Sequence, residues 1–305
     1  MAILLNSNYE LRSGWKFAAY VTFFLLIWVA TGLALTLVVA RRSGNLLTDQ
    51  LVVLALNEIA LFVAAVCAMW LTVRFMDHRP FRTFGIGFLP RWRQDFFFGV
   101  LLAAGMLGVL IGGCYAFGYV SMHWTGRQVS PDVLLATFIL LLMAAVNEEL
   151  VFRGFPLQVL IDGMGAWPAM IAMSTLFGAV HLNNPNASLL GTANTVVAGI
   201  LLSLAYVKTH SLWMPYGIHV GWNVGLGFVF GFKLSGVDIA SLWTTGTAGS
   251  ETILGGDYGP EGGLLVTFIF AVAAVIVNKH GFINRTEAHP GGHPWRHYRN
   301  RAGNS

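Results

Sequence analysis

Long apolar runs are the feature that most constrains what this chain can fold into. Eight of them occur, near residues 17–40, 51–73, 96–120, 133–160, 166–182, 190–207, 211–230 and 263–278. A helix needs roughly 20 mostly apolar residues to cross a bilayer, so the pattern predicts an all-α, polytopic integral membrane protein with about eight transmembrane helices. Composition agrees, because only 10% of the residues are charged, against roughly 25% in soluble domains.

The distribution of basic residues predicts the orientation in the membrane. The 74–95 loop carries five arginines against two aspartates, and the segment after residue 278 is also basic. The 231–262 loop is acidic by contrast, although Arg41 and Arg42 oppose the pattern. Since basic loops stay in the cytoplasm, we expect both termini there. The net charge of +4 predicts contact with anionic lipid rather than nucleic-acid binding.

Four parts of the chain follow from this pattern. Residues 1–130 form N-terminal transmembrane helices with a basic cytoplasmic loop, and residues 131–230 form a helical core that carries the polar motifs. Residues 231–278 form a non-cytoplasmic loop and the last span, and residues 279–305 form a basic, disordered cytoplasmic tail. Two cysteines, Cys67 and Cys114, lie inside apolar runs and read as small hydrophobic residues.

The segment EELVFR places two acids and an arginine in lipid-buried sequence. Charged groups in a span are expensive, so each requires a function or a partner. Residues four apart share a helix face, which predicts an ion pair between Glu149 and Arg153. Glu148 is rotated by about 100° from Glu149 and is expected to face a cavity instead. A carboxylate in such a cavity is suited to act as a general base.

Two further segments repeat the four-residue spacing: FGAVH, with Phe177 and His181, and HVGWN, with His219 and Asn223. Their positions along the predicted helices bring the polar groups to similar depths as Glu148. A carboxylate and an imidazole can activate a water, and a second imidazole and an amide can stabilise an oxyanion. Glu148, His181 and His219 are also a set that can hold zinc. The sequence has no HExxH segment.

Taken together, EELVFR, FGAVH and HVGWN give the chain a resemblance to the CPBP (Abi) family of intramembrane proteases, which includes the type II CAAX prenyl endopeptidases. The family patterns EExxxR, FxxxH and HxxxN occur in order over roughly 130 to 230. The resemblance implies water activation by Glu148 with His181, oxyanion support from His219 and Asn223, and structural support from Glu149 and Arg153. It implies a membrane-associated protein or peptide substrate, prenylated proteins among them, and a location in a bacterial plasma membrane. Family members are described both as metalloproteases and as glutamate-dependent enzymes without metal.

Other interpretations of the same residues stay open. The EELVFR cluster alone is compatible with a structural ion pair, and each histidine alone with a hydrogen-bonded core residue. A proton-coupled transporter also buries Glu and His, although the chain lacks evident internal repeats. A membrane scaffold or a bacteriocin-immunity protein would keep the motifs for folding. Glu58 is interpreted as an interhelical hydrogen-bonding residue, and residues 255–263 as a turn-rich loop.

Overall fold

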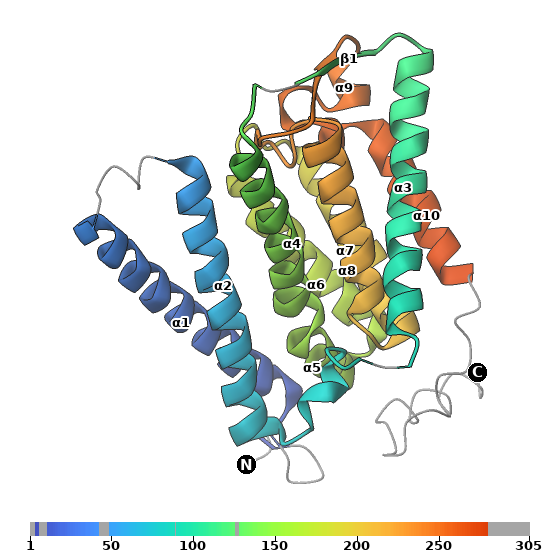
Figure 1. Ribbon diagram of the computed structural model, residues 1–305. Helices are drawn as coiled ribbons and strands as arrows, with labels where there is room; N and C mark the ends of the chain where they lie inside the picture. The colour runs from blue at the N-terminus through green and yellow to red at the C-terminus, as the bar shows by residue number, and fades with distance from the viewer. Residues whose placement is uncertain (1–3, 6–10, 43–48, 89, 126–127, 280–305) are drawn as a thin grey trace.

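The computed structural model describes residues 4–5, 11–42, 49–88, 90–125 and 128–279. The predicted disordered tail, residues 279–305, lies outside this part of the chain except for its first residue. The described part is predominantly helical, as predicted, and is arranged as a bundle with one helix pair set to the side (Figure 1). The helices are α1 Ser13–Arg42, α2 Gln50–Thr72, α3 Trp92–Ala116, α4 Pro131–Arg153, α5 Phe155–Met164, α6 Ala166–Val180, α7 Leu189–Thr209, α8 Trp213–Asn223, α9 Glu251–Leu254 and α10 Leu264–Lys279.

Short irregular helical segments extend or join these elements. The π-helical segments η2, Val73–Asp77, and η5, Val224–Val229, continue α2 and α8. The 3₁₀ segments η3, Phe81–Phe84, and η4, His181–Asn183, follow α2 and α6, and η6, Gly256–Tyr258, and η7, Pro260–Gly262, precede α10. These segments matter for the site because His181 lies in one of them and Asn223 ends the helix that another continues.

Five of the described helical segments are long and apolar enough to cross a membrane. They are Ser13–Arg41, Gln50–Asp77, Trp92–Ala116, Pro131–Met164 and Leu189–Thr209. These segments correspond to five of the eight predicted spans and indicate an integral membrane protein. The other three predicted spans correspond to shorter helices, since α6 has 15 residues, α8 has 11 before η5, and α10 has 16. The predicted number of eight spans is therefore not confirmed.

The predicted fourth span is divided in two by Gly154. Pro156 is the obvious helix-breaking residue of this segment, but α4 ends at Arg153 and α5 begins at Phe155. Gly154 has φ −67° and ψ −126°, and a Cβ there would lie 2.6 Å from the Leu150 carbonyl oxygen. Pro156 lies in the first turn of α5, where its missing N–H costs no hydrogen bond. The glycine makes the break, and Arg153 becomes the last residue of α4.

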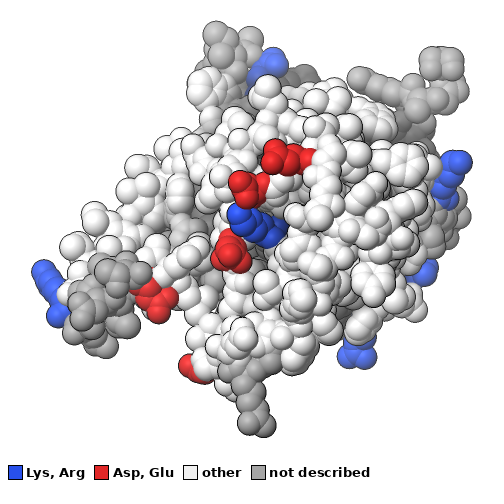
Figure 2. Space-filling view, turned by 90° about the horizontal axis from the view of Figure 1, so that it is seen from above, with Lys and Arg blue, Asp and Glu red and all other residues white. Residues whose placement is uncertain are grey.

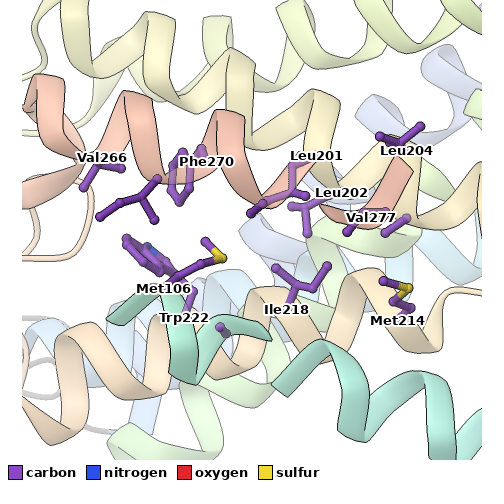
Figure 3. Packing of buried hydrophobic residues seen from close by; sticks show 14 of the residues in the cluster. Met106, Leu201, Leu202, Leu204, Met214, Ile218, Trp222, Val266, Phe270 and Val277 are labelled. Carbon is purple, nitrogen blue, oxygen red and sulfur yellow. The ribbon is translucent and has the colours of Figure 1, made fainter. Parts of the chain in front are cut away.

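Helices α3 and α8 pack closely because glycines face the opposite backbone. A Cβ at Gly99 of α3 would lie 2.5 Å from the carbonyl oxygen of Met214 in α8. Around this contact, apolar side chains of α3, α7, α8 and α10 form the central core (Figure 3). Met106, Ile218, Trp222 and Phe270 of that core also face the cavity described below. The core thus fixes the apolar walls of the site.

An ion-pair network joins α1 and α2 to α5 near the basic loop. The Asp77 carboxylate pairs with Lys16 at 2.9 Å and also with Arg79, whose Nη1 lies 2.8 Å from Asp162 Oδ2. The carboxylates of Asp77 and Asp162 raise the pKa of Arg79 above its usual value despite partial burial. At their opposite ends α1 and α2 stand apart from the rest of the bundle (Figure 1).

A small antiparallel sheet, absent from the predicted all-helical pattern, lies at the end of the bundle opposite the N-terminus (Figure 1), which is called the outer end below. Strand β1, Val120–Trp124, pairs with β2, Trp243–Thr247, in the register Val120↔Thr247 to Trp124↔Trp243. This sheet joins the segment before α4 to the segment after α8, which are the helices that carry Glu148 and His219. Both strands are five residues long, which is too short for an alternation of polar and apolar residues to stand out in the sequence.

Candidate active site

A cavity of about 190 Å³ lies among α2, α4, α6, α7 and α8. Its wall carries all four residues for which the sequence predicted a catalytic role: Glu148, His181, His219 and Asn223. Most of the remaining lining is apolar and comes from Leu54, Met106, Leu140, Leu141, Ala144, Ala198, Leu201, Leu202, Ile218 and Phe270. Segments far apart in the sequence, from Leu54 to Phe270, thus meet at one cavity with room for several water molecules.

The two adjacent acids of α4 lie in different environments. The Glu149 side chain is 1% exposed, and its Oε1 lies 3.1 Å from Arg153 Nη1. The Glu148 side chain is 29% exposed and lines the cavity. A turn of about 100° per residue separates the two carboxylates, which directs one to the interior and the other to open space.

Arg153 is fully buried and has several contacts besides Glu149. Its Nη2 donates to the Gly199 carbonyl oxygen at 3.4 Å, and its Cζ lies 4.3 Å from the centre of the Phe177 ring. A charged group with no exposed surface is tolerated only when it is paired and hydrogen-bonded. Arg153 therefore ties α4 to α6 and α7 behind the cavity.

His219 bridges the two acids of α4, a contact that sequence spacing within one helix did not reveal. Its Nδ1 lies 2.8 Å from Glu149 Oε1, and its Nε2 lies 3.6 Å from Glu148 Oε2. Because a carboxylate only accepts, Nδ1 carries a proton that it donates to Glu149. Glu149 therefore orients the imidazole of α8 as well as pairing with Arg153. Asn223 follows one turn later on the same helix, at the same cavity.

His181 begins η4, directly after the last turn of α6. Its Nδ1 lies 2.7 Å from the Phe177 carbonyl oxygen, so Nδ1 is the donor of this hydrogen bond. In the neutral ring this leaves the lone pair on Nε2, which is the form that accepts a proton. The carboxylate of Glu148 lies next to His219, whereas His181 lies on another part of the cavity wall.

The Phe177 ring lies among the polar groups of the site. Its centre is 4.7 Å from that of His181 and 6.2 Å, edge-on, from that of His219. With Arg153 over it, the ring contacts three of the motif side chains. Phe177 therefore packs against both histidines and Arg153 and forms part of the cavity wall.

Two further acids, which are not part of the motifs, line the cavity. Glu58 of α2 accepts a hydrogen bond from Asn147 Nδ2 at 2.7 Å, as its interhelical interpretation predicted. Glu261 of η7 accepts from Trp222 Nε1 at 2.9 Å and from Ser235. Glu58 was visible in sequence as an acid within a span, whereas Glu261 lies in a glycine-rich loop that gave no such signal.

The outer loop that carries Glu261 is held against the bundle. Asn194 of α7 donates from Nδ2 to the carbonyl oxygens of Glu261 and Gly263, at 2.8 and 2.9 Å. Tyr258, in the same loop, is buried, and burial together with the Glu261 charge raises its pKa. The loop thus forms a fixed outer wall of the cavity.

A zinc site formed by Glu148, His181 and His219 stays a prediction. Among the residues that the structure describes, no three His, Cys, Asp or Glu side chains lie close enough together to hold a metal ion. His219 directs Nδ1 to Glu149 and His181 directs Nδ1 to its own helix, so Nε2 is the remaining ring nitrogen of each, as in histidines that bind a metal. Glu148 and His219 are adjacent, and His181 does not complete the set.

Comparison with known proteins agrees with the motifs. Residues 130–225 match the family model described as type II CAAX prenyl endopeptidase Rce1-like. The chain is 29% identical over 191 residues to "Uncharacterized protein YyaK" of Bacillus subtilis (strain 168), covering 59% of this chain and 62% of that protein. It is 27% identical over 144 residues to "Uncharacterized 24.3 kDa protein" of Escherichia coli, covering 44% of this chain and 64% of that protein.

The matches span less than two thirds of each of these two relatives. The residues matched to the Rce1-like family include all three motifs. They therefore include all four predicted catalytic residues, from Glu148 to Asn223. The family resemblance predicted from EELVFR, FGAVH and HVGWN is therefore confirmed: residues 130–225 form a core similar to the type II CAAX prenyl endopeptidase Rce1-like family.

Proposed function

We propose that this chain is an intramembrane endopeptidase of the CAAX-protease type, with Glu148 as its general base. The observation that carries the proposal is the contrast between the adjacent acids. Glu149 is committed to Arg153 and His219, whereas Glu148 lines the cavity beside His219. A structural role for the motif would explain Glu149 and Arg153 but leaves Glu148 without a reason to be there.

In the proposed reaction a water in the cavity lies between Glu148, His181 and the scissile carbonyl of a peptide. Glu148 takes a proton from the water, the oxygen bonds to the carbonyl carbon, and the carbonyl π electrons move to the oxygen. His181, with its lone pair on Nε2, accepts a hydrogen bond from the same water and orients it. Glu148 then gives the proton to the leaving nitrogen as the C–N bond breaks.

The oxyanion formed in this step requires donors, and we assign this role to His219 and Asn223, which line the same cavity. Asn223 can donate from its amide nitrogen. His219 can donate from Nε2 only when both ring nitrogens are protonated, and the flanking carboxylates of Glu148 and Glu149 balance the charge of that form. This assignment gives Glu149 an indirect role through His219.

We further propose that the substrate is a membrane-associated peptide or protein and that both termini are cytoplasmic. The largely apolar cavity wall supports the first point. The second is supported by Figure 1, in which the start of α1, the basic loop before α3 and the end of α10 lie at one end of the bundle. The acidic segment between η5 and α10 lies at the other end.

The test is cleavage of a peptide library by the purified protein in liposomes, followed by mass spectrometry. Glu148→Gln removes the base while keeping size, and we expect product formation to fall by roughly 10²–10⁴-fold. Glu251→Gln, which changes an exposed acid of the outer loop, is the matched control and should leave the rate unchanged. A Glu148→Gln rate equal to wild type refutes the mechanism.

Two further arms of the same experiment distinguish the competing functions. A chelator that abolishes cleavage would show that a metal takes part. Solute flux across the liposomes without any cleaved product would favour the transporter interpretation over the peptidase.

A further inference from the structure

The cavity wall is rich in hydrogen-bond acceptors, and no arginine or lysine is among the described residues that line it. Three carboxylates line it, those of Glu58, Glu148 and Glu261. Glu148 Oε2 is also buried without a hydrogen-bond partner among the described residues. A buried acceptor without a donor is unfavourable, so a ligand that donates hydrogen bonds would be stabilised here.

The three carboxylates are not equally available to a ligand. Glu261 already accepts from Trp222 Nε1 at 2.9 Å, from the Ser235 backbone nitrogen at 2.6 Å and from Ser235 Oγ at 2.8 Å. Glu148 is assigned to the reacting water. Glu58 is the remaining carboxylate at the cavity that can receive a substrate group.

Asn147 holds Glu58 in place next to the proposed base. Its Nδ2 donates to Glu58 Oε2 at 2.7 Å and to the Glu58 backbone oxygen at 2.9 Å. Asn147 is fully buried and directly precedes Glu148 in α4. The position of Glu58 is thereby fixed relative to Glu148. A residue that recognises a substrate side chain beside the scissile bond needs such a fixed position.

The outer surface has the same sign of charge as the cavity. Figure 2 shows acidic side chains gathered around a basic one near the centre of this face. The exposed acids of the outer segment are Asp238, Glu251 and Asp257, and Lys233 Nζ lies 3.4 Å from Asp257 Oδ1.

We propose that Glu58 is a specificity-determining residue that selects substrates with a lysine or arginine side chain close to the scissile bond. The proposal rests on the peptidase function above. An ammonium or guanidinium group would supply the donor that Glu148 Oε2 lacks and would neutralise the charge of Glu58. A free C-terminal carboxylate at the same place would instead add a negative charge to a wall that already carries three.

The experiment separates binding from cleavage. Fluorescent peptides, capped at both ends so that only side chains carry charge, differ at one central position as Lys, norleucine or Glu. Their dissociation constants are measured with the Glu148→Gln protein in nanodiscs, which retains the cavity but not the proposed base. The same measurement follows with Glu58→Gln added, and with Glu251→Gln added as the matched loss of one exposed acid.

We expect the Lys peptide to bind at least about tenfold more tightly than the norleucine peptide, and the Glu peptide to bind least, because hydrogen bonds to charged groups contribute about 1.5–3 kcal/mol. Adding Glu58→Gln should remove most of the Lys preference, and adding Glu251→Gln should not. Equal binding of the three peptides, or a preference that survives Glu58→Gln, overturns the proposal. Wild-type cleavage of the same peptides reports on the peptidase function separately.

Discussion

Replacing Arg153 by methionine tests whether the buried ion pair stabilises the fold behind the cavity. The change removes the charge and keeps a long apolar side chain. It leaves the Glu149 carboxylate, 1% exposed, with one donor, His219 Nδ1 at 2.8 Å. Removing one partner of a buried pair costs about 3–5 kcal/mol. Because His219 remains, we expect a value of about 3 kcal/mol, at the lower end of this range.

The expected effect on thermal unfolding follows from that value. Domains of 150–250 residues shift by about 2–4 °C per kcal/mol, which gives a loss of about 6–12 °C in Tm for Arg153→Met. Circular dichroism of the protein in one fixed detergent would measure it. The double variant Glu149→Gln, Arg153→Met removes the uncompensated charge, while the glutamine oxygen still accepts from His219. The double variant should therefore recover at least half of the loss.

Arg91→Met is the control, because Arg91 is exposed and bonds only to Gln94 among the contacts described for its side chain. It should change Tm by no more than a degree or two. The reasoning fails if the Tm of Arg153→Met lies within 2 °C of the wild-type Tm, since a buried carboxylate without its partner should destabilise the fold by more than that. It also fails if the double variant is less stable than the single one.

Three further predictions concern packing, the outer loop and chemistry. Gly99→Ala should lower Tm by several degrees, because its Cβ would lie 2.5 Å from a backbone oxygen of α8, whereas Gly105→Ala on the same helix meets nothing within 4 Å and should keep or raise Tm. Asn194→Ala removes the amide that bonds the carbonyls of the 261–263 segment, so limited proteolysis should cut that segment faster; unchanged cleavage would contradict this. His219→Ala should lower kcat by roughly 10²–10³-fold if it is an oxyanion donor, and a wild-type kcat would reject that role.

The core of the site was predictable because helical periodicity is a local property. Spacing of four residues places Glu149 with Arg153, and the rotation between neighbours separates Glu148 from both. The structure has this pair at 3.1 Å and places Glu148 at the cavity. The membrane character was equally accessible, since runs of apolar residues report on lipid exposure without knowledge of tertiary contacts.

Contacts between helices were not accessible in the same way. Nothing in the sequence around Glu149 indicates that its second partner is His219, 70 residues away. The link between Asn147 and Glu58 is equally remote, 89 residues apart. The division of the fourth span at Gly154 was missed because the neighbouring Pro156 is the stronger helix-breaking signal, although its place in a first turn makes it harmless.

The short helices around the site have a consequence for the surrounding bilayer. Helices α6 and α10 have 15 and 16 residues, which at about 1.5 Å per residue gives roughly 22–24 Å. The hydrocarbon layer of an ordinary bilayer is about 30 Å thick. If these helices cross the bilayer, the lipid next to them must thin to match their length. Thinning brings the aqueous phase closer to His181, which directly follows α6. Mismatch between short helices and lipid would then supply the water that a hydrolytic reaction inside a membrane requires.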